Sequence, residues 1–287
     1  MGRKGLQWVS SKFINSKFKN YNHIIMEKNN PFELDAVPRR VMPLIFLVDT
    51  SGSMDGAKIA SLNVAVQESL KDVGEISKNN SDAQIKVAVL EFSSGTQWMY
   101  PQPIESESFK WQDLKASGLT SLGAAYSELN EKLSKSHGFM AEPTGSRAPA
   151  IILLTDGQPT DDYKHPLEKL KGNPWFKAGV KVAIAIGDAD TNVNILAEFT
   201  GNKEAVLTVH NVDQLKKIIK TVSVTASQVA SQSASVGVSG NGSTTPADAQ
   251  SQVVSSVTNA VDTDDALKNV DQGDSTANSG TDDWENW

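Results

Sequence analysis

Carboxylate and hydroxyl side chains follow two apolar runs of this 287-residue chain and occupy a loop between them. The first run, PLIFLVD, ends at Asp49 and is followed at alternate positions by Ser51 and Ser53. The second run, AIILLTD, ends at Asp156, and Thr120 lies in the intervening segment SGLTSLG. Such oxygen ligands suit Mg²⁺ or Mn²⁺ in near-octahedral geometry and disfavour zinc and copper. The residue types therefore predict one divalent metal site, provided that the three segments meet.

Few protein charges in this ligand set leave the expected metal shell incomplete. An ion held by neutral hydroxyls, and by carboxylates partly through water, can accept one further anionic oxygen, such as the Asp or Glu of a partner protein. Gly52 and Gly157 fit beside it, because tight turns close to an ion favour residues without a side chain. For any single loop the alternative is ordinary helix capping and turn formation.

Apolar runs of strand length recur along the chain and alternate with segments of helical spacing. Runs that are apolar throughout are typical of strands buried on both faces of a parallel sheet. We expect strands at residues 43–49, 85–94, 149–157, 180–187 and 205–209. We expect helices at residues 58–73, after Thr120 through Leu133, 162–178, 193–199 and 211–222.

This alternation predicts an α/β fold with a doubly wound, mostly parallel β-sheet flanked by helices. Residues 96–101 follow the second strand across Gly95 and predict one antiparallel edge strand. Crossovers between parallel strands are right-handed, which places the carboxyl ends of the strands at one edge of the sheet. The metal-binding loops are expected to meet there.

Charge and composition divide the chain into three parts. Residues 1–41 form a basic extension, 42–222 the folded domain, and 223–287 an acidic tail rich in Ser, Thr, Gly and Asn. We expect the extension to be partly disordered, with an alternative start at Met26, and the tail to be mostly disordered, since its composition offers little apolar area to bury. Tail residues Asp264 and Asp265 could fold back onto the metal, although an inert tail is the favoured interpretation.

The formal net charge of -7 argues against nucleic acid as the main partner. The sequence has no cysteine, which excludes thiolate catalysis and thiolate metal ligands and suits a reducing cytoplasm. It also has no apolar run of the roughly 18 to 20 residues that a membrane span needs. We therefore expect a cytoplasmic protein without integral membrane association, and the sequence leaves its oligomeric state open.

The motifs DTSGS, GLTSLG and LLTDGQPTD together resemble the metal-ion-dependent adhesion site (MIDAS) of a von Willebrand factor type A domain. The resemblance covers about residues 42–222 and implies a Rossmann-like fold and a non-enzymatic protein-binding module. It implies that Ser51, Ser53 and Thr120 bind the ion directly, while Asp49 and Asp156 act directly or through water. VDTSGSM close after an Arg pair, and TDGQPTD, are similar to the bacterial TerY type associated with tellurite resistance and stress, although the Cys-free tail lacks the zinc-binding segment of some TerY relatives.

Two other functions compete with this interpretation. The strand-end Asp49 could begin a phosphoryl-transfer or other hydrolytic enzyme, but the second carboxylate expected two residues later is Ser51. The sequence also has no G-x-S-x-G, no P-loop motif and no G-x-G-x-x-G after the first strand. The second rival is a scaffold in which the metal only stabilises the fold.

Several residues outside the metal motifs receive structural interpretations. Asp161 and Asp162 fit a solvated helix start better than a role at the site. Four dispersed histidines show no ligand spacing and are interpreted as structural or exposed: His23, His137, His165 and His210. The closing DDWENW is held loosely as a short recognition motif.

Overall fold

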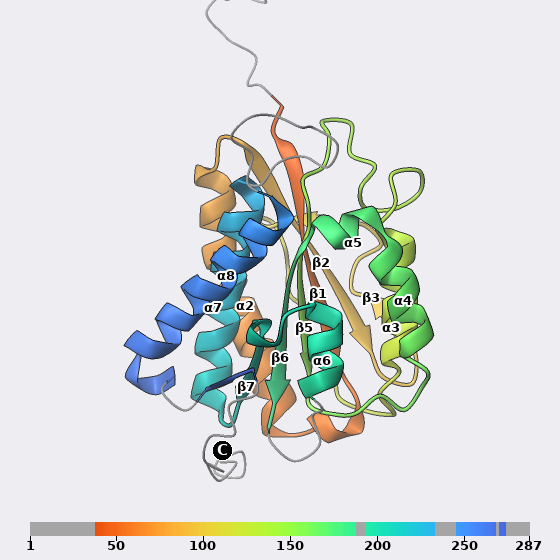
Figure 1. Ribbon diagram of the computed structural model, residues 1–287, viewed down its shortest axis with the longest axis vertical. Helices are drawn as coiled ribbons and strands as arrows, with labels where there is room; N and C mark the ends of the chain where they lie inside the picture. Colours follow the sequence, from red (N-terminus) through yellow and green to blue (C-terminus); the bar gives the residue numbers. More distant parts are fainter. Residues whose placement is uncertain (1–37, 188–192, 233–244, 268–269, 274–287) are drawn as a thin grey trace, which may run out of the picture. The chain divides into compact units, whose positions relative to one another are not determined.

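A central β-sheet with helices on both faces organises the computed structural model, which describes residues 38–187, 193–232, 245–267 and 270–273 (Figure 1). The strands are β1 (Arg40–Asp49), β2 (Ala83–Phe92), β3 (Thr96–Trp98), β4 (Ile104–Glu105), β5 (Ala150–Thr155), β6 (Val180–Ile186), β7 (Val206–Val209) and β8 (Asp271–Gln272). The helices are α2 (Ala57–Asn79), α3 (Leu122–Lys132), α4 (Lys164–Gly172), α5 (Pro174–Ala178), α6 (Val193–Thr200), α7 (Val212–Gln232) and α8 (Pro246–Thr263). Short 3-10 helices are η1 (Gly52–Met54), η2 (Lys203–Ala205) and η3 (Asp265–Leu267).

The sheet has the strand order β3-β2-β1-β5-β6-β7-β8, with β4 also pairing with β2. The five strands from β2 to β7 in this order are parallel. Strand β1 is buried over nine of its ten residues, as expected for a central strand covered on both faces. The doubly wound, mostly parallel sheet is therefore confirmed, and so is the antiparallel edge strand over Thr96–Trp98.

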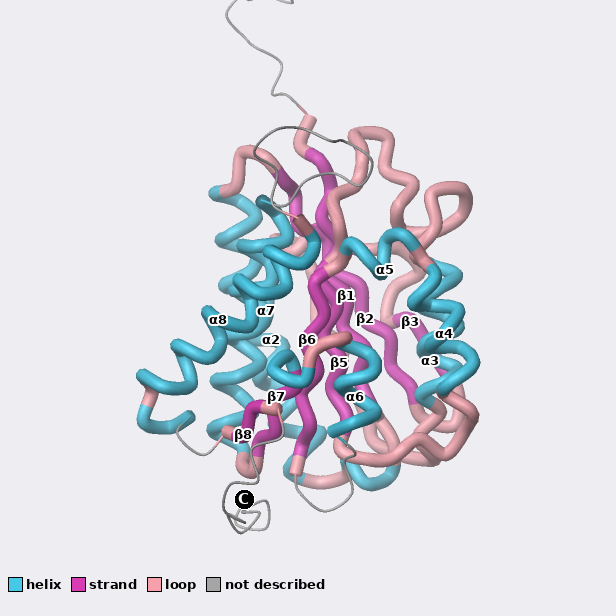
Figure 2. The backbone as a smooth tube through the Cα atoms, viewed as in Figure 1, coloured by secondary structure: helices cyan, strands magenta, loops and turns pink. Residues whose placement is uncertain are grey.

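Two apolar layers lie on opposite faces of the sheet. Alternate β1 residues divide between them: Leu44 and Phe46 pack with α2, α7 and α8, while Ile45 and Leu47 pack with α3 to α6. Figure 2 shows the same division, with α2, α7 and α8 to one side of the sheet and α3 to α5 to the other. Burial on both faces stabilises the sheet whose strand ends carry the predicted metal-binding loops.

The expected disorder from residue 223 onward is wrong for the described part of the tail. Helix α7 continues to Gln232, and its serines at positions 223, 227 and 231 are buried. Helix α8 packs on the same layer, and β8 adds a second antiparallel edge by pairing with β7. The physical reason is that small residues let helices approach closely, so a serine-rich stretch can lie inside a helix contact.

Helix α8 has the local features of a stable helix. Thr245 and Asp248 form a reciprocal capping box, and Pro246 occupies the first turn, where it is well tolerated. Its buried residues follow helical spacing: Ala249, Val253, Val254, Val257 and Val261. The polar composition of residues 223–287 led to a prediction of disorder, although the valines of α8 recur at helical spacing.

Candidate metal centre

The register of the sheet brings two of the predicted loops together. Asp49 is the last residue of β1, and Val48 pairs with Leu154 of β5, so Asp49 lies beside Thr155 at the end of the neighbouring strand. Asp156 follows directly. Because the strands are parallel, both loops leave the sheet at the same edge, toward the bottom of Figure 1.

Asp49 lies at the bottom of the site and has no exposed surface. Its Oδ1 accepts a hydrogen bond from the Ser51 backbone N–H at 2.8 Å, and its Oδ2 accepts one from Thr155 Oγ1 at 2.5 Å. Burial raises the pKa of Asp49 above its ordinary value; hydrogen bonds from Thr155 and Ser51 oppose the rise, and the charge of Asp156 adds to it. A buried carboxylate of this kind is stabilised by a nearby cation.

The hydroxyl groups of Ser51 and Ser53 lie between Asp49 and the second carboxylate, Asp156. Ser51 Oγ lies 3.1 Å from Ser53 Oγ, and Ser53 Oγ donates to Asp156 Oδ1 at 2.7 Å. Neighbouring ligands of an octahedral Mg²⁺ are about 3.0 Å apart, given Mg–O bonds of about 2.1 Å. The spacing of these oxygens therefore fits adjacent positions of one magnesium shell.

Thr120 lies next to the same oxygens. A methyl group added at Gly157 would lie 3.5 Å from Thr120 Oγ1 and 3.6 Å from Ser53 Oγ, so both hydroxyls approach one point above this glycine. The structure thus brings all five predicted residues together, and their role as metal ligands stays a prediction.

Backbone hydrogen bonds between the loops hold this arrangement in place. The Ser117 N–H donates to Thr50 O at 2.7 Å, and the Gly52 N–H donates to Gly118 O at 3.0 Å. The Thr160 N–H donates to Thr120 O at 2.9 Å. The first loop is therefore joined to the second, and the second to the third, which makes the hydroxyl positions a property of the fold.

The donor set fits a hard cation. Among the described residues, no group of three or more His, Cys, Asp or Glu side chains forms a metal site. The five predicted residues offer two carboxylates and three hydroxyls, which are hard oxygen donors. Of the five residues only Ser53 is exposed, while Asp49, Ser51, Thr120 and Asp156 are buried, so the site reaches solvent on the side of Ser53.

Sequence reasoning missed two side chains that contact the site. Thr155 holds Asp49, and Lys58 Nζ forms a 2.7 Å ion pair with Asp156 Oδ2. Thr155 was hidden inside an apolar strand. Lys58 gave one signal, since a cation in the first turn of a helix opposes the helix dipole and calls for a reason.

Asp161 and Asp162 have different roles. Asp162 Oδ1 accepts from the Lys164 N–H at 3.1 Å, which agrees with the predicted helix start. Asp161 instead accepts from the N–H groups of Gly123 and Ala124, each at 3.0 Å, and so caps α3 from a distant part of the chain. These bonds hold the start of α3, which directly follows the loop of Thr120.

The remaining candidates have other contacts or are exposed. Asp264 binds Lys217 Nζ at 2.7 Å, so in this structure it does not fold back onto the site. His210 contacts Asp271 Oδ2 at 3.2 Å, His137 contacts Ser136, and His165 is exposed, in agreement with their structural or exposed interpretation. His23, Met26 and DDWENW lie outside the described residues.

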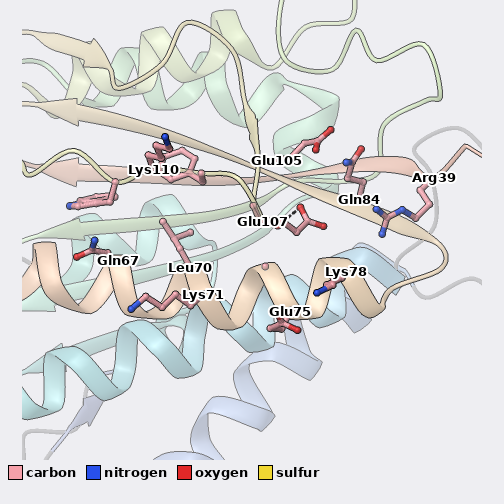
Figure 3. Close-up of a pocket in the computed structure, with 14 residues that line it drawn as sticks. Arg39, Gln67, Leu70, Lys71, Glu75, Lys78, Gln84, Glu105, Glu107 and Lys110 are labelled. Carbon is pink, nitrogen blue, oxygen red and sulfur yellow. Dashed lines mark hydrogen bonds between the residues drawn. The ribbon is translucent and has the colours of Figure 1, made fainter.

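A separate cavity of about 770 Å³ lies between the second half of α2 and the segment after β4 (Figure 3). Its lining mixes cations such as Lys71 and Lys78 with Glu75 and Glu107. None of the five predicted metal ligands lines it. The cavity is therefore distinct from the candidate metal centre.

Comparison with known proteins identifies a family model that matches most of the described sheet. The sequence model described as the von Willebrand factor type A domain matches residues 44–221. The collagen alpha-6(VI) chain of Homo sapiens is 29% identical over 185 residues, and that of Mus musculus is 27% identical over 191 residues. Each similarity covers 62% of this chain and only 8% of the collagen chain, so this chain spans a small fraction of these relatives.

Solved structures are also similar to this chain, at low sequence identity. A von Willebrand factor type A protein from Catenulispora acidiphila has a TM-score of 0.49 at 18% identity, covering 66% of this chain and 43% of that one. Proximal thread matrix protein 1 from the mussel byssus, with a zinc-occupied MIDAS motif, has a TM-score of 0.47 at 19% identity, covering 66% and 48%.

Proposed function

This chain belongs to the von Willebrand factor type A domain family, and from this premise we propose that it captures an acidic residue of a partner protein through a divalent cation. Asp49, Ser51, Ser53, Thr120 and Asp156 would hold the ion, which is Mg²⁺ or Mn²⁺. The observation that carries the proposal is the row of oxygens from Ser51 through Ser53 to Asp156, with separations of 3.1 and 2.7 Å. Bound there, the ion would supply an electrophilic position toward solvent.

The hydrogen bonds that the two carboxylates of the site accept support binding and not catalysis. Asp49 is held by Ser51 N–H and Thr155, and Asp156 by Ser53 and Lys58, so both carboxylates already accept hydrogen bonds. A nucleophile or general base needs a free oxygen aimed at a substrate. The solvent-facing side chain of the site is the Ser53 hydroxyl, which is suited to share a metal shell with an outside carboxylate.

An apolar contact beside the metal adds to the proposed surface. Leu119 precedes Thr120 and has 59% of its surface exposed, one of two large exposed hydrophobic residues in the described part of the chain. Its backbone N–H is held by Ser94 Oγ at 3.1 Å, so the side chain is presented from a fixed loop. We expect the partner to offer an acidic residue with an apolar neighbour.

The TerY-like motifs support a narrower proposal about setting. VDTSGSM following Arg39 and Arg40, and TDGQPTD, favour a cytoplasmic bacterial protein of tellurite or stress response. In the described residues no helix is long and apolar enough to cross a membrane.

Metal-dependent capture tests the main proposal. Immobilised chain is incubated with lysate of its native cell in Mg²⁺ or in EDTA, and retained proteins are identified by mass spectrometry. Asp49→Ala and Ser53→Ala should keep the fold and abolish Mg²⁺-dependent capture, while Ser251→Ala, an exposed serine of α8, should behave as wild type. Equal recovery of the same proteins with and without chelator would refute the proposal. If chelation lowers only the melting temperature, the metal is structural.

Replacing Leu119 separates the partner contact from the metal. Leu119→Ser removes an exposed apolar group without touching a predicted ligand, so Mg²⁺ affinity measured by calorimetry should stay unchanged. Capture of the identified partner should weaken by about 1–3 kcal/mol, the usual range for an apolar contact at an interface. Val64→Ser, at the other large exposed hydrophobic residue, should leave capture unaltered.

A further inference from the structure

Lys58 forms an ion pair with one of the proposed metal ligands. Its Nζ lies 2.7 Å from Asp156 Oδ2, and the side chain of Asp156 is completely buried while that of Lys58 is 23% exposed. The other carboxylate oxygen, Oδ1, accepts from Ser53. Both oxygens of Asp156 are thus engaged by groups of the chain itself.

The position of Lys58 is unfavourable for the helix that carries it. Helix α2 begins at Ala57, so Lys58 lies in its first turn, where the helix dipole favours acids and disfavours cations. The first turn of α2 contains no acidic residue to offset this charge. The contact with Asp156 supplies the compensation that the helix lacks.

A second positive charge beside the metal has a clear electrostatic consequence. Lys58 and a divalent ion would both lie within reach of Asp156, in a site whose carboxylates are shielded from solvent. Like charges at such distances repel strongly where water screens them poorly. The cation that stabilises Asp156 without metal therefore opposes the metal.

We propose that Lys58 is a built-in competitor for the metal: it neutralises Asp156 in the metal-free protein and leaves this carboxylate when a divalent ion binds. The proposal rests on the proposed metal-dependent function and adds a means of setting its metal affinity. The site then fills only when the free ion concentration is high enough to displace the lysine. The metal-free domain, meanwhile, avoids leaving a buried carboxylate unpaired.

Titration with Mn²⁺ alone tests this inference on the full chain. Lys58→Met removes the charge and keeps much of the apolar stem, and we expect it to lower the Kd for Mn²⁺ by about tenfold or more in calorimetry. Lys58→Arg keeps the charge and should bind as wild type does. Lys71→Met is the matched control, because it removes a lysine about 20 Å further along the same helix.

Thermal unfolding provides the second measurement and a check on folding. Without metal, Lys58→Met should unfold at a lower temperature than wild type, and Mn²⁺ should raise its melting temperature by more than it raises that of wild type. An unchanged or higher Kd in Lys58→Met overturns the role of Lys58, whereas binding by wild type still supports the proposed function. Absence of Mn²⁺ binding in every variant overturns both.

Discussion

At the residue scale, Tyr126 shows how a buried polar group can weaken this core. Its side chain is fully buried, its ring stacks on Phe199 with centroids 5.4 Å apart, and its hydroxyl has no hydrogen-bond partner among the described residues. Tyr126→Phe keeps the ring contact and removes the hydroxyl, so we expect the free energy of unfolding to stay equal or rise by about 1–2 kcal/mol. Urea denaturation measures this change.

Alkaline pH sharpens this prediction. Burial raises the pKa of Tyr126 well above its ordinary value of 10.0, so the folded chain keeps a proton that the unfolded chain loses. Above about pH 10 the folded state binds more protons, and stability from this group falls as pH rises. Tyr126→Phe should reduce that loss. Tyr100→Phe is the control: the Tyr100 hydroxyl donates to Lys110 O at 2.7 Å, so its removal should destabilise slightly.

That the five residues of the candidate metal centre lie close together could be predicted, because their types repeat at strand ends. The alternate spacing of Asp49, Ser51 and Ser53 indicates a shared loop site. The turn residues around Thr120 and Asp156 indicate the two loops that join it. Lys58 and Thr155 were not predictable, since each contacts a carboxylate from a distant part of the chain. Such partners depend on the β1–β5 register, which pattern alone does not give.

At the element scale, α3 depends on a cap from outside its own sequence. Asp161 accepts from the N–H groups of Gly123 and Ala124, while Ser121 at the N-cap position makes no side-chain capping bond. Asp161→Ala should lower the free energy of unfolding by about 1–2 kcal/mol, as loss of a helix cap does. Asp162→Ala, which affects only an exposed bond to Lys164, should lower it less. Equal losses in both variants would contradict the capping role.

Elements of the family domain were predicted well, and those after it were not. The parallel strands were predicted from continuous apolar runs, and α2 from apolar residues at helical spacing. The bounds differ in two places: α2 extends to Asn79, and residues 162–178 divide into α4 and α5 at Asn173. Helix α7 was predicted to end ten residues early, because its later turns pack through serines. Serine is neutral in hydropathy arguments, and only the neighbouring helix reveals that it is buried.

At the scale of the whole molecule, α8 completes a core that the family match leaves open. The match ends at residue 221, inside α7, whereas Val253 and Val257 of α8 are buried in the same apolar layer as α2 and α7. Val253→Ala should lower the free energy of unfolding by about 1–3 kcal/mol through lost burial. Ser251→Ala, on the exposed side of α8, should change it by less than about 0.5 kcal/mol. Thermal and urea unfolding would measure both.

The two outer strands of the sheet also limit how another protein can attach. In the described part of the chain, β3 has three residues and β8 has two, so each end of the sheet offers only a short row of backbone groups. A peptide that binds by extending a sheet requires a longer row. Under the proposed function, selectivity would reside in the side chains around the strand-end loops, and a linear epitope would be chosen by its charge and not by its backbone.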